Sequence, residues 1–255
     1  MKLIINADDC GYSKTNNSHI KQAIEKGKIT STTIMANMPE VEDAIRLYET
    51  YHNDISFGIH LNLTEGEPLV NSQTLVDFGY YAVNNGRSCF NFDNAEQFRY
   101  KRLPKAIKDA IYRELAAQIT KLKDMGIELS HIDSHQHIHT CASLMGVIAQ
   151  LSKDFNLPKV RRIKNYVSPH SMSFWGRQAW YILSKTHNRH YIMANYFSSF
   201  QDYFNNPALL SLKDKDSLEL MVHPGHYQEA YQEEEQMMLD TNYPSNIHLI
   251  NYKEL

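Results

Sequence analysis

Apolar and polar residues alternate along the first sixty positions in a pattern that predicts strands and helices in turn. Three short runs of apolar or β-branched residues are typical of buried strands: residues 2–6, 32–35 and 56–61. Two stretches between them carry apolar residues at helical spacing: residues 13–26 and 41–51. Ser13 and Gly27 are suited to begin and end the first helix. This order predicts a parallel sheet whose strands are joined by crossover helices.

The same alternation returns after residue 102. The pattern predicts two helices and the start of a third: residues 103–125, 144–155 and 229–235. It also predicts four strands: residues 131–134, 159–163, 218–222 and 247–250. No repeat, low-complexity tract or linker divides the sequence, and 255 residues is a normal length for an α/β barrel. Residues 1–255 are therefore expected to form a single α/β domain.

Residues 66–102 interrupt this rhythm. The segment contains Pro68, Gly79 and Gly86 together with scattered aromatic residues, and it shows no clean period. A long irregular insertion in a compact domain is usually functional. We therefore interpret it as a lid that covers the substrate. A second aromatic region, at 168–204, is expected to shape substrate choice.

The composition is that of an ordinary globular protein, with 42% hydrophobic and 22% charged residues. The formal net charge of −3 and the scattered Lys and Arg residues argue against a nucleic-acid partner. Cys10, Cys89 and Cys141 are too far apart for a disulfide framework or a cysteine zinc site. No apolar stretch reaches the length of a membrane span or a signal peptide. We expect a cytoplasmic protein without a membrane partner.

Polar clusters follow four of the predicted strands, at residues 6–9, 58–62, 131–139 and 223–225. The carboxyl ends of the strands in a parallel barrel meet on one face, where catalytic groups gather. Taken singly, His60 and His223 are more typical of core histidines than of ligands. Taken with the other clusters, they predict one shared active site built from Asp8, Asp9, His60, His135 and His223.

Asp8 and Asp9 are adjacent carboxylates that would repel each other if both were buried without a partner. A divalent cation that binds one of them leaves the other free to act as a base. The alternative is a helix N-terminus with acidic residues in its first turn, since a helix is predicted shortly afterwards. The histidine clusters expected in the same pocket favour the metal site.

The tract 131–139 is rich in histidine. Alternate residues of a strand share a face, so His131, Asp133 and His135 could all point into the barrel. Neutral imidazole is the commonest metal ligand, and its second nitrogen usually needs a carboxylate or carbonyl partner. His137 and His139 are expected to support the ligands or to lie in the following loop. The alternative is an exposed, metal-scavenging or solvated tract.

Together these motifs resemble the YdjC-like carbohydrate deacetylases, the family of chitooligosaccharide deacetylase. The resemblance runs nearly end to end, through Gly11, Ser13 and residues 6–9, 30–33, 58–61, 131–139 and 223–225. It implies an irregular TIM-like (β/α) barrel. By position it also implies metal ligands at Asp9, His60 and His135. The sequence departs from the family at Cys10, where Phe is common, and matches less clearly at 168–204.

The resemblance further assigns roles around the metal. It implies Asp8 as the catalytic base, His223 as the general acid and Arg161 as the residue that orients the acidic site. Residues expected to contact the substrate or support the ligands are Asn62, His131, Asp133, His137 and His139. The implied cofactor is one divalent metal ion, Mg²⁺ or Zn²⁺, with Mn²⁺ and Co²⁺ as alternatives.

The implied reaction is hydrolysis of the N-acetyl group of an amino sugar or chitooligosaccharide, phosphorylated or not, with release of acetate. The substrate is then a small N-acetylated sugar, and a homodimer is compatible with the resemblance. Two alternatives stay open. One is another metallohydrolase, such as a phosphoesterase or a different amidase, and the other is a non-catalytic sugar-binding protein.

Overall fold

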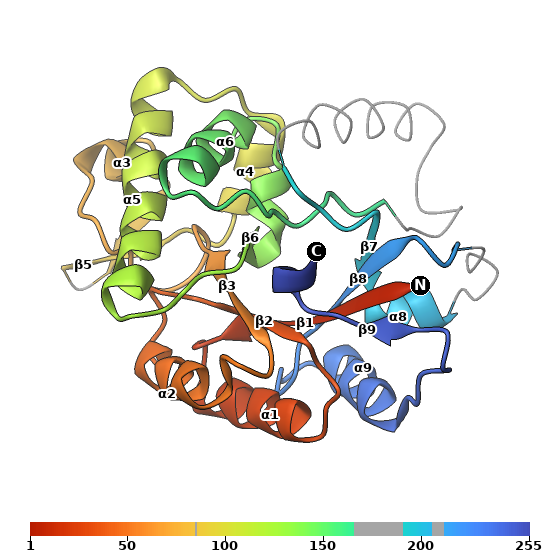
Figure 1. The fold of residues 1–255 in the computed structure, drawn as a ribbon. Coiled ribbons are helices and arrows are strands. Elements are labelled where there is room, and N and C mark those ends of the chain that lie inside the picture. The colour runs from red at the N-terminus through yellow and green to blue at the C-terminus, as the bar shows by residue number, and fades with distance from the viewer. Residues whose placement is uncertain (85, 166–190, 206–211) are drawn as a thin grey trace.

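The computed structural model describes residues 1–84, 86–165, 191–205 and 212–255 (Figure 1). Within these ranges the main feature is a parallel sheet in the order β6-β3-β2-β1-β8-β7, with β9 paired to β1. The sheet curls into a half-barrel (Figure 1). Its strands are β1 (Lys2–Cys10), β2 (Ser31–Ile34), β3 (Ser56–Leu61), β6 (Ile132–Ser134), β7 (Tyr196–Ser199), β8 (Ser217–Val222) and β9 (His248–Leu249).

Helices lie around the outside of the curled sheet (Figure 1). They are α1 (Lys14–Glu25), α2 (Val41–Tyr51), α5 (Lys105–Asp124), α6 (Met145–Asp154), α8 (Phe200–Asn205) and α9 (Glu229–Asp240). As predicted, Ser13 caps α1 by accepting a hydrogen bond from the Asn16 amide, and Gly27 follows with a φ of 63°. Ile20 and Ala23 face the core from this helix. The alternation of strands and helices predicted from the sequence is confirmed.

Beyond β6 the sheet continues as single parallel bridges. Ile132 pairs with Val160, and Lys159 pairs with Ile192. The strand predicted at 159–163 is thus present only as bridge residues, because each side of this pairing is too short to form a ladder. The pattern missed β7, which lies inside the aromatic region at 168–204. A curled α/β sheet is confirmed, whereas a fully closed barrel stays a prediction.

The insertion at 66–102 is not irregular, and that expectation was wrong. It contains α3 (Gln73–Asp77), an antiparallel hairpin of β4 (Tyr81–Asn84) and β5 (Arg87–Phe90), and α4 (Asn94–Tyr100). Elements of four to seven residues are shorter than the window in which periodicity becomes visible. Glu114 on α5 anchors the segment by accepting hydrogen bonds from the amides of Leu69 and Val70, at 3.1 and 2.8 Å. Its role as a lid stays a prediction.

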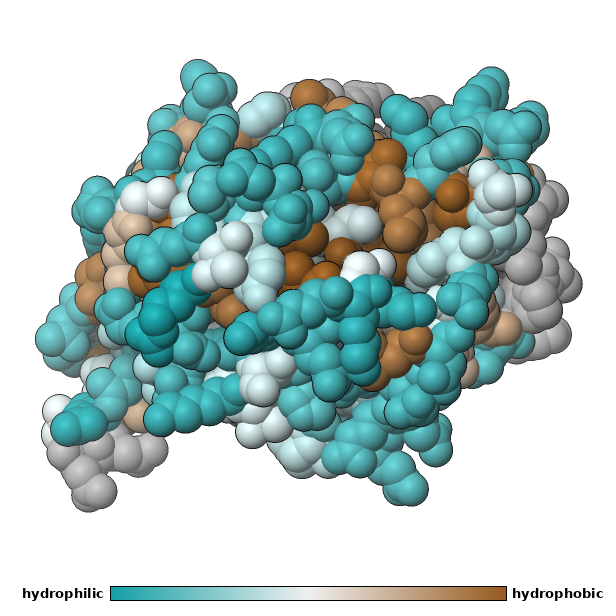
Figure 2. Space-filling model, turned by 60° about the horizontal axis from the view of Figure 1, so that its bottom comes forward, coloured by the Kyte–Doolittle hydropathy of each residue, from teal (hydrophilic) through white to brown (hydrophobic). Residues whose placement is uncertain are grey.

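The surface of the described part is largely hydrophilic on the face shown in Figure 2. Figure 2 shows one face, on which hydrophilic residues dominate and hydrophobic ones gather mainly across the middle. Across the described ranges, every helix is too short or too polar for a membrane span. Residues 166–190 hold much of the aromatic region at 168–204, so that part of the substrate-choice prediction lies outside the described residues.

The C-terminal turn, η4 (Tyr252–Glu254), lies over the middle of the curled sheet (Figure 1). The Tyr252 ring stacks on His131, with centroids 3.5 Å apart and an interplanar angle of 6°. The His131 ring in turn lies against Gly58 on β3. A Cβ atom at Gly58 would lie 2.5 Å from His131 Cε1 and 2.8 Å from its carbonyl oxygen. Only glycine leaves room for this stack.

Replacing Gly58 with alanine should therefore destabilise the fold. The added methyl group must displace both the ring and the backbone of His131, which costs about 1–3 kcal/mol. Urea unfolding followed by circular dichroism measures the loss. Gly146→Ala in α6 is the matched control, because nothing lies within 4 Å of its Cβ position. That control should gain up to about 1 kcal/mol from helix propensity. Equal stability of the two variants would refute the steric explanation.

Candidate active site

The predicted site residues converge where four strands end. Asp8 and Asp9 lie near the end of β1, His60 is in β3, and His135 and His223 directly follow β6 and β8. β1 and β8 are hydrogen-bonded neighbours, as are β3 and β6. The sheet therefore brings together side chains that are far apart in the sequence. It forms one polar cluster at the carboxyl ends of the strands, as the barrel prediction requires.

A bulge in β1 lets two consecutive aspartates face the same site. The pairing of β1 with β2 shifts register between Ala7 and Cys10, and Asp9 has a φ of 64°. In a regular strand, Asp8 and Asp9 would point to opposite faces. A left-handed conformation at a non-glycine residue is strained, and such strain is often found at functional sites. Both carboxylates are buried, with exposures of 2% and 3%.

Asp9, His60 and His135 form a compact set of candidate metal ligands. Asp9 Oδ1 lies 3.2 Å from His60 Nε2 and 2.9 Å from His135 Nδ1. One ligand atom from each residue lies within 4.8 Å of the others. Ligands about 2 Å from a shared ion lie roughly 3–4 Å apart. The oxygen and nitrogen donors and their spacing therefore fit one divalent cation.

Asp133 supports this set from behind. The His60 Nδ1 atom lies 2.6 Å from Asp133 Oδ1 and 3.1 Å from Thr33 Oγ1. This contact fixes the ring so that Nε2 faces Asp9, as in many carboxylate–histidine–metal arrangements. Burial alone would lower the pKa of His60, but the charge and hydrogen bond of Asp133 raise it to about 10. At neutral pH the raised pKa keeps both ring nitrogens of His60 protonated. Metal binding at Nε2 would displace the proton on that nitrogen.

His135 contacts a carboxylate that the sequence analysis missed. Its Nε2 atom lies 3.0 Å from Glu65 Oε1, on the opposite side of the ring from Asp9. Asn62 holds the turn that carries Glu65, because its amide nitrogen donates to the Glu65 carbonyl at 2.7 Å and its oxygen accepts from the Glu65 amide at 3.2 Å. Asn62 thus supports the site through Glu65. Glutamates in polar turns are usually solvated, so no sequence signal pointed to this one.

Arg161 is fully buried and contacts three carboxylates, those of Asp8, Asp133 and Glu219. Its Nη atoms donate to both oxygens of Asp8 at 2.7 Å, and Nε donates to Glu219 Oε1 at 2.7 Å. Nη1 also lies 2.8 Å from Asp133 Oδ2. Burial alone would raise the pKa of Asp8, but the charge and hydrogen bonds of Arg161 hold it well below the ordinary value of 3.8. Asp8 is therefore a carboxylate at neutral pH.

Glu219 was also missed, although its position in β8 gave a signal. It is an acidic residue in the middle of an otherwise apolar strand, and it is fully buried. A buried carboxylate needs a partner, and Glu219 has two. One is Arg161, and the other is the Tyr252 hydroxyl, which donates to Oε2 at 2.5 Å. The C-terminal turn is thereby connected to the Arg161 network.

His223 lies near Asp8 and contacts a glutamate on α9. Its Nε2 atom lies 4.0 Å from Asp8 Oδ2, and its Nδ1 atom lies 3.3 Å from Glu234 Oε2 on α9. Burial alone would lower the pKa of His223, but the hydrogen bond to Glu234 and the charges of Asp8 and Asp9 raise it. Glu234 was not singled out from the sequence. It is one of several adjacent glutamates that a sequence cannot tell apart.

The other histidines of the tract do not join the ligand cluster. His131 lies in the stack with Tyr252. The turn η1 (His135–Thr140) then bends the chain, with φ angles of 50° and 55° at Gln136 and His137. Burial lowers the pKa of His137 to about 3, and its ring packs 5.8 Å from that of Phe197. His139 Nδ1 pairs with Ser134 Oγ. These positions suit structural support of the turn that presents His135.

Comparisons with known proteins show which family the chain belongs to. The family model described as YdjC-like protein matches residues 2–249. The chain belongs to the YdjC-like family. It is 32% identical over 281 residues to a carbohydrate deacetylase of Clostridium beijerinckii, and the match covers 100% of both chains. It is also 32% identical to a carbohydrate deacetylase of Oceanobacillus iheyensis, over 91% of this chain and 89% of the relative.

A solved structure shares the YdjC-like fold seen here. It is a candidate cellobiose-phosphate cleavage protein of Enterococcus faecalis, with a TM-score of 0.72 and 21% identity. The match covers 99% of this chain and 98% of the other. At this identity the likeness concerns the fold alone. The resemblance read from the sequence motifs is confirmed, and the individual residue roles stay predictions.

Removing the charge of Arg161 should cost much of the stability. In Arg161→Met three buried carboxylates lose their cation, and breaking buried ion pairs in this way costs about 3–5 kcal/mol. Chemical unfolding at pH 7 measures the change. Arg113→Met, at an exposed position on α5, is the matched control and should stay within about 0.5 kcal/mol of the wild type. A similar small change in both variants would contradict the role given to Arg161.

Proposed function

We propose that the protein is a metal-dependent deacetylase that hydrolyses the N-acetyl group of an amino sugar. One observation carries this proposal. The carboxylate of Asp8, held ionised by Arg161, lies beside the candidate ligand set and 4.0 Å from His223. Base, metal site and acid thus surround one point at the ends of the strands. The carbohydrate deacetylases among the relatives support the choice of a sugar amide as substrate.

Asp9, His60 and His135 are the residues that would hold the metal ion. Their donor set suits Mg²⁺ or Zn²⁺, and Mn²⁺ or Co²⁺ as well. When bound, the ion supplies a positive charge that polarises the amide carbonyl and acidifies water. The buried carboxylate of Asp133 keeps His60 aligned for this task. Glu65 holds the ring of His135 from its other side.

Asp8 is the proposed base. Arg161 binds both of its oxygens, which fixes the carboxylate plane and keeps the group charged. Oδ1 also accepts a hydrogen bond from Asn6 Nδ2 at 2.9 Å, so Oδ2 is the oxygen that keeps a lone pair to accept a proton from the attacking water. General base catalysis of this kind contributes about 10²- to 10⁴-fold in rate.

His223 is the proposed acid. Its pKa is raised, so that a protonated ring is available to the leaving amine. An amine cannot leave as an anion, which makes this proton necessary. Glu234 holds Nδ1 and leaves Nε2 directed toward Asp8 and the reacting group.

The network around Arg161 argues against a phosphoesterase. That reaction calls for a second metal or a free cation near the phosphate. A second candidate cluster, Asp8, His60 and Asp133, shares His60 with the first set. Two of its carboxylates already bind Arg161.

The insertion at 66–102 is proposed as the lid, with Phe78 and Phe92 exposed by 56% and 63% for contact with a sugar face.

Acetate release from N-acetylated sugars tests the proposed reaction. Metal-loaded wild type should release acetate, and Asp8→Asn should lower kcat by about 10²- to 10⁴-fold. Calorimetric titration with Zn²⁺ should still detect binding to Asp8→Asn, because Asp8 is outside the ligand set. Asp124→Asn, an exposed position at the end of α5, should behave as wild type. Metal binding without acetate release from any N-acetylated sugar would support the metal site and refute the proposed reaction.

The pH profile tests His223 and Glu234. The acid must be protonated, so kcat should fall as the pH rises through the raised pKa of His223. Glu234→Gln removes the charge that helps to raise this pKa, which should move the alkaline limb about one unit toward lower pH. Glu233→Gln changes the exposed neighbour and should leave the limb in place. An alkaline limb that is unchanged in Glu234→Gln would exclude His223 as the titrating acid.

A further inference from the structure

One residue of η4 reaches the network that holds the proposed base, although it takes no part in the steps derived above. Tyr252 is fully buried, and η4 lies over the middle of the curled sheet (Figure 1). Its hydroxyl donates to Glu219 Oε2 at 2.5 Å, and Glu219 Oε1 accepts from Arg161 Nε at 2.7 Å. The other edge of the same guanidinium binds both oxygens of Asp8. A continuous chain of hydrogen bonds thus runs from Tyr252 to the proposed base.

The guanidinium group of Arg161 can transmit a change of position because it is planar and rigid. Its Nε and Nη edges cannot rotate independently, so a contact that fixes one edge also sets the direction of the other. Asp8 and Asp133 share Nη1, at 2.7 and 2.8 Å, while Glu219 binds Nε. The Phe197 ring lies against one face, with its centroid 4.9 Å from Arg161 Cζ. Glu219 therefore helps to set the plane in which the Nη edge meets Asp8.

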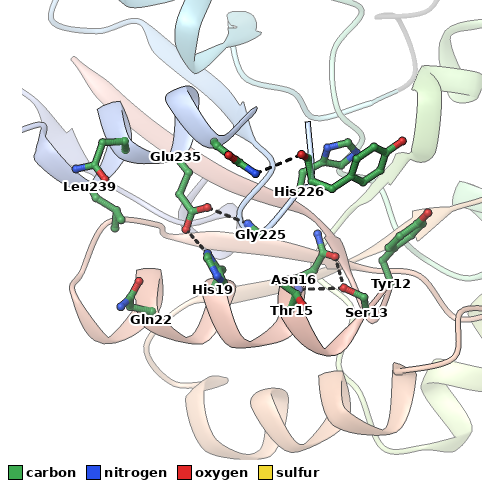
Figure 3. Close-up of a pocket in the computed structure, with 13 residues that line it drawn as sticks. Tyr12, Ser13, Thr15, Asn16, His19, Gln22, Gly225, His226, Glu235 and Leu239 are labelled. Atoms are coloured by element: carbon green, nitrogen blue, oxygen red, sulfur yellow. Dashed lines mark hydrogen bonds and ion pairs between the residues drawn. The ribbon is translucent and has the colours of Figure 1, made fainter. Parts of the chain in front are cut away.

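The strand that carries Glu219 is itself held in place, so the remaining freedom lies in the side chain. β8 is hydrogen-bonded to β1 on one side and to β7 on the other. The turn after β8 is tied to α9 and α1, because Glu235 accepts from the Gly225 amide at 2.9 Å and lies 2.7 Å from His19 Nδ1 (Figure 3). A glutamate on a fixed strand can still rotate about its side-chain bonds. The hydrogen bond from Tyr252 restricts this rotation.

Tyr252 is held at its ring and at its backbone, so its hydroxyl is presented in one position. The ring stacks on His131, with centroids 3.5 Å apart. The backbone amide donates to Ser56 Oγ at 3.0 Å, and the carbonyl accepts from Lys159 Nζ at 2.5 Å. Burial and the charge of Glu219 raise the pKa of Tyr252, so the hydroxyl keeps its proton and remains a donor. Little further entropy is lost when a preorganised donor of this kind holds a carboxylate.

We propose that Tyr252 is a positioning residue for the hydrolytic step. Its hydroxyl orients Glu219, which orients Arg161, which in turn holds Asp8 for the attacking water. The inference rests on the proposed function, in which Asp8 is the base. The tyrosine acts through these neighbours and not by contact with the reacting group. Alignment matters at this point, because a misplacement of about 1 Å at a reacting group can cost about 10²-fold in rate.

Replacing Tyr252 with phenylalanine tests this role, because the ring and its stack on His131 are kept and only the hydroxyl is lost. In the metal-loaded enzyme, Tyr252→Phe should lower kcat for an N-acetylated sugar by about 10-fold, as is usual for residues that support a site from behind. KM and the calorimetric affinity for Zn²⁺ should stay as in the wild type, because Asp133 contacts His60 directly. An unchanged kcat, or a loss of Zn²⁺ affinity equal to the loss of kcat, would indicate a merely structural role and overturn the proposal.

Tyr112→Phe is the matched control. The Tyr112 hydroxyl also donates to a carboxylate, Asp154 Oδ2 at 2.7 Å, but at the surface between α5 and α6. Its loss should leave kcat, KM and Zn²⁺ affinity as in the wild type. An equal fall of kcat in both variants would contradict a specific role for Tyr252.

Combining Tyr252→Phe with Glu219→Gln tests the route through Glu219. If the hydroxyl acts through this carboxylate, both changes remove the same link. The kcat of the double variant should then be close to that of Glu219→Gln alone. Losses that simply multiply would show that the two residues act independently and would overturn the proposal.

The Arg161 side chain provides a readout that needs no turnover. NMR can follow the exchange of its Nε proton with solvent, which requires the contact with Glu219 to open. This exchange should be about 10-fold faster in Tyr252→Phe than in Tyr112→Phe. Faster exchange in a protein that releases no acetate would support the chain of contacts and reject the reaction. Acetate release by the wild type, with equal exchange and equal kcat in the two variants, would reject the positioning role and keep the deacetylase.

Discussion

The described site depends above all on the buried charge of Arg161. This one cation contacts Asp8, Asp133 and Glu219, and each carboxylate serves a different part of the molecule. Asp8 faces the candidate active site, Asp133 holds the candidate ligand His60, and Glu219 connects to the C-terminal turn. Three buried carboxylates without a cation would be too costly to keep ionised. A single guanidinium therefore helps to set the charge state of the proposed base and, through Asp133, the position of the candidate ligand His60.

The curled sheet separates the candidate active-site residues from the stabilising ones along the strands. At the carboxyl ends, strain at Asp9 and close polar contacts shape the candidate metal site. Further along the enclosed face, the stack of His131 on Tyr252 fills the space next to Gly58. Arg161 lies between the two regions and contacts both. Each carboxylate in this interior has buried partners: Arg161 contacts all three, His60 also pairs with Asp133, and Tyr252 also donates to Glu219.

Sequence patterns predicted the strand ends, because buried parallel strands are apolar runs and the polar residues that follow them stand out. Asp8 and His60 were found in this way. The bulge that turns Asp9 into the site was not, since a backbone dihedral leaves no pattern in side-chain types. Glu219 could have been found as an acid within an apolar strand. Glu65 could not, because a glutamate in a turn looks the same whether it contacts water or a histidine.

The distance along the chain between Asp8 and Arg161 has a consequence for how the protein is made. The two residues are 153 positions apart, and Asp8 lies on β1, in the centre of the sheet. As the chain leaves the ribosome, β1 emerges long before its cation and before its neighbour β8. Burying the Asp8 carboxylate before its cation is present would cost free energy, because a buried charge needs a partner. The charged centre can therefore form only after residue 161 has emerged, and until then the Asp8 carboxylate is best kept hydrated.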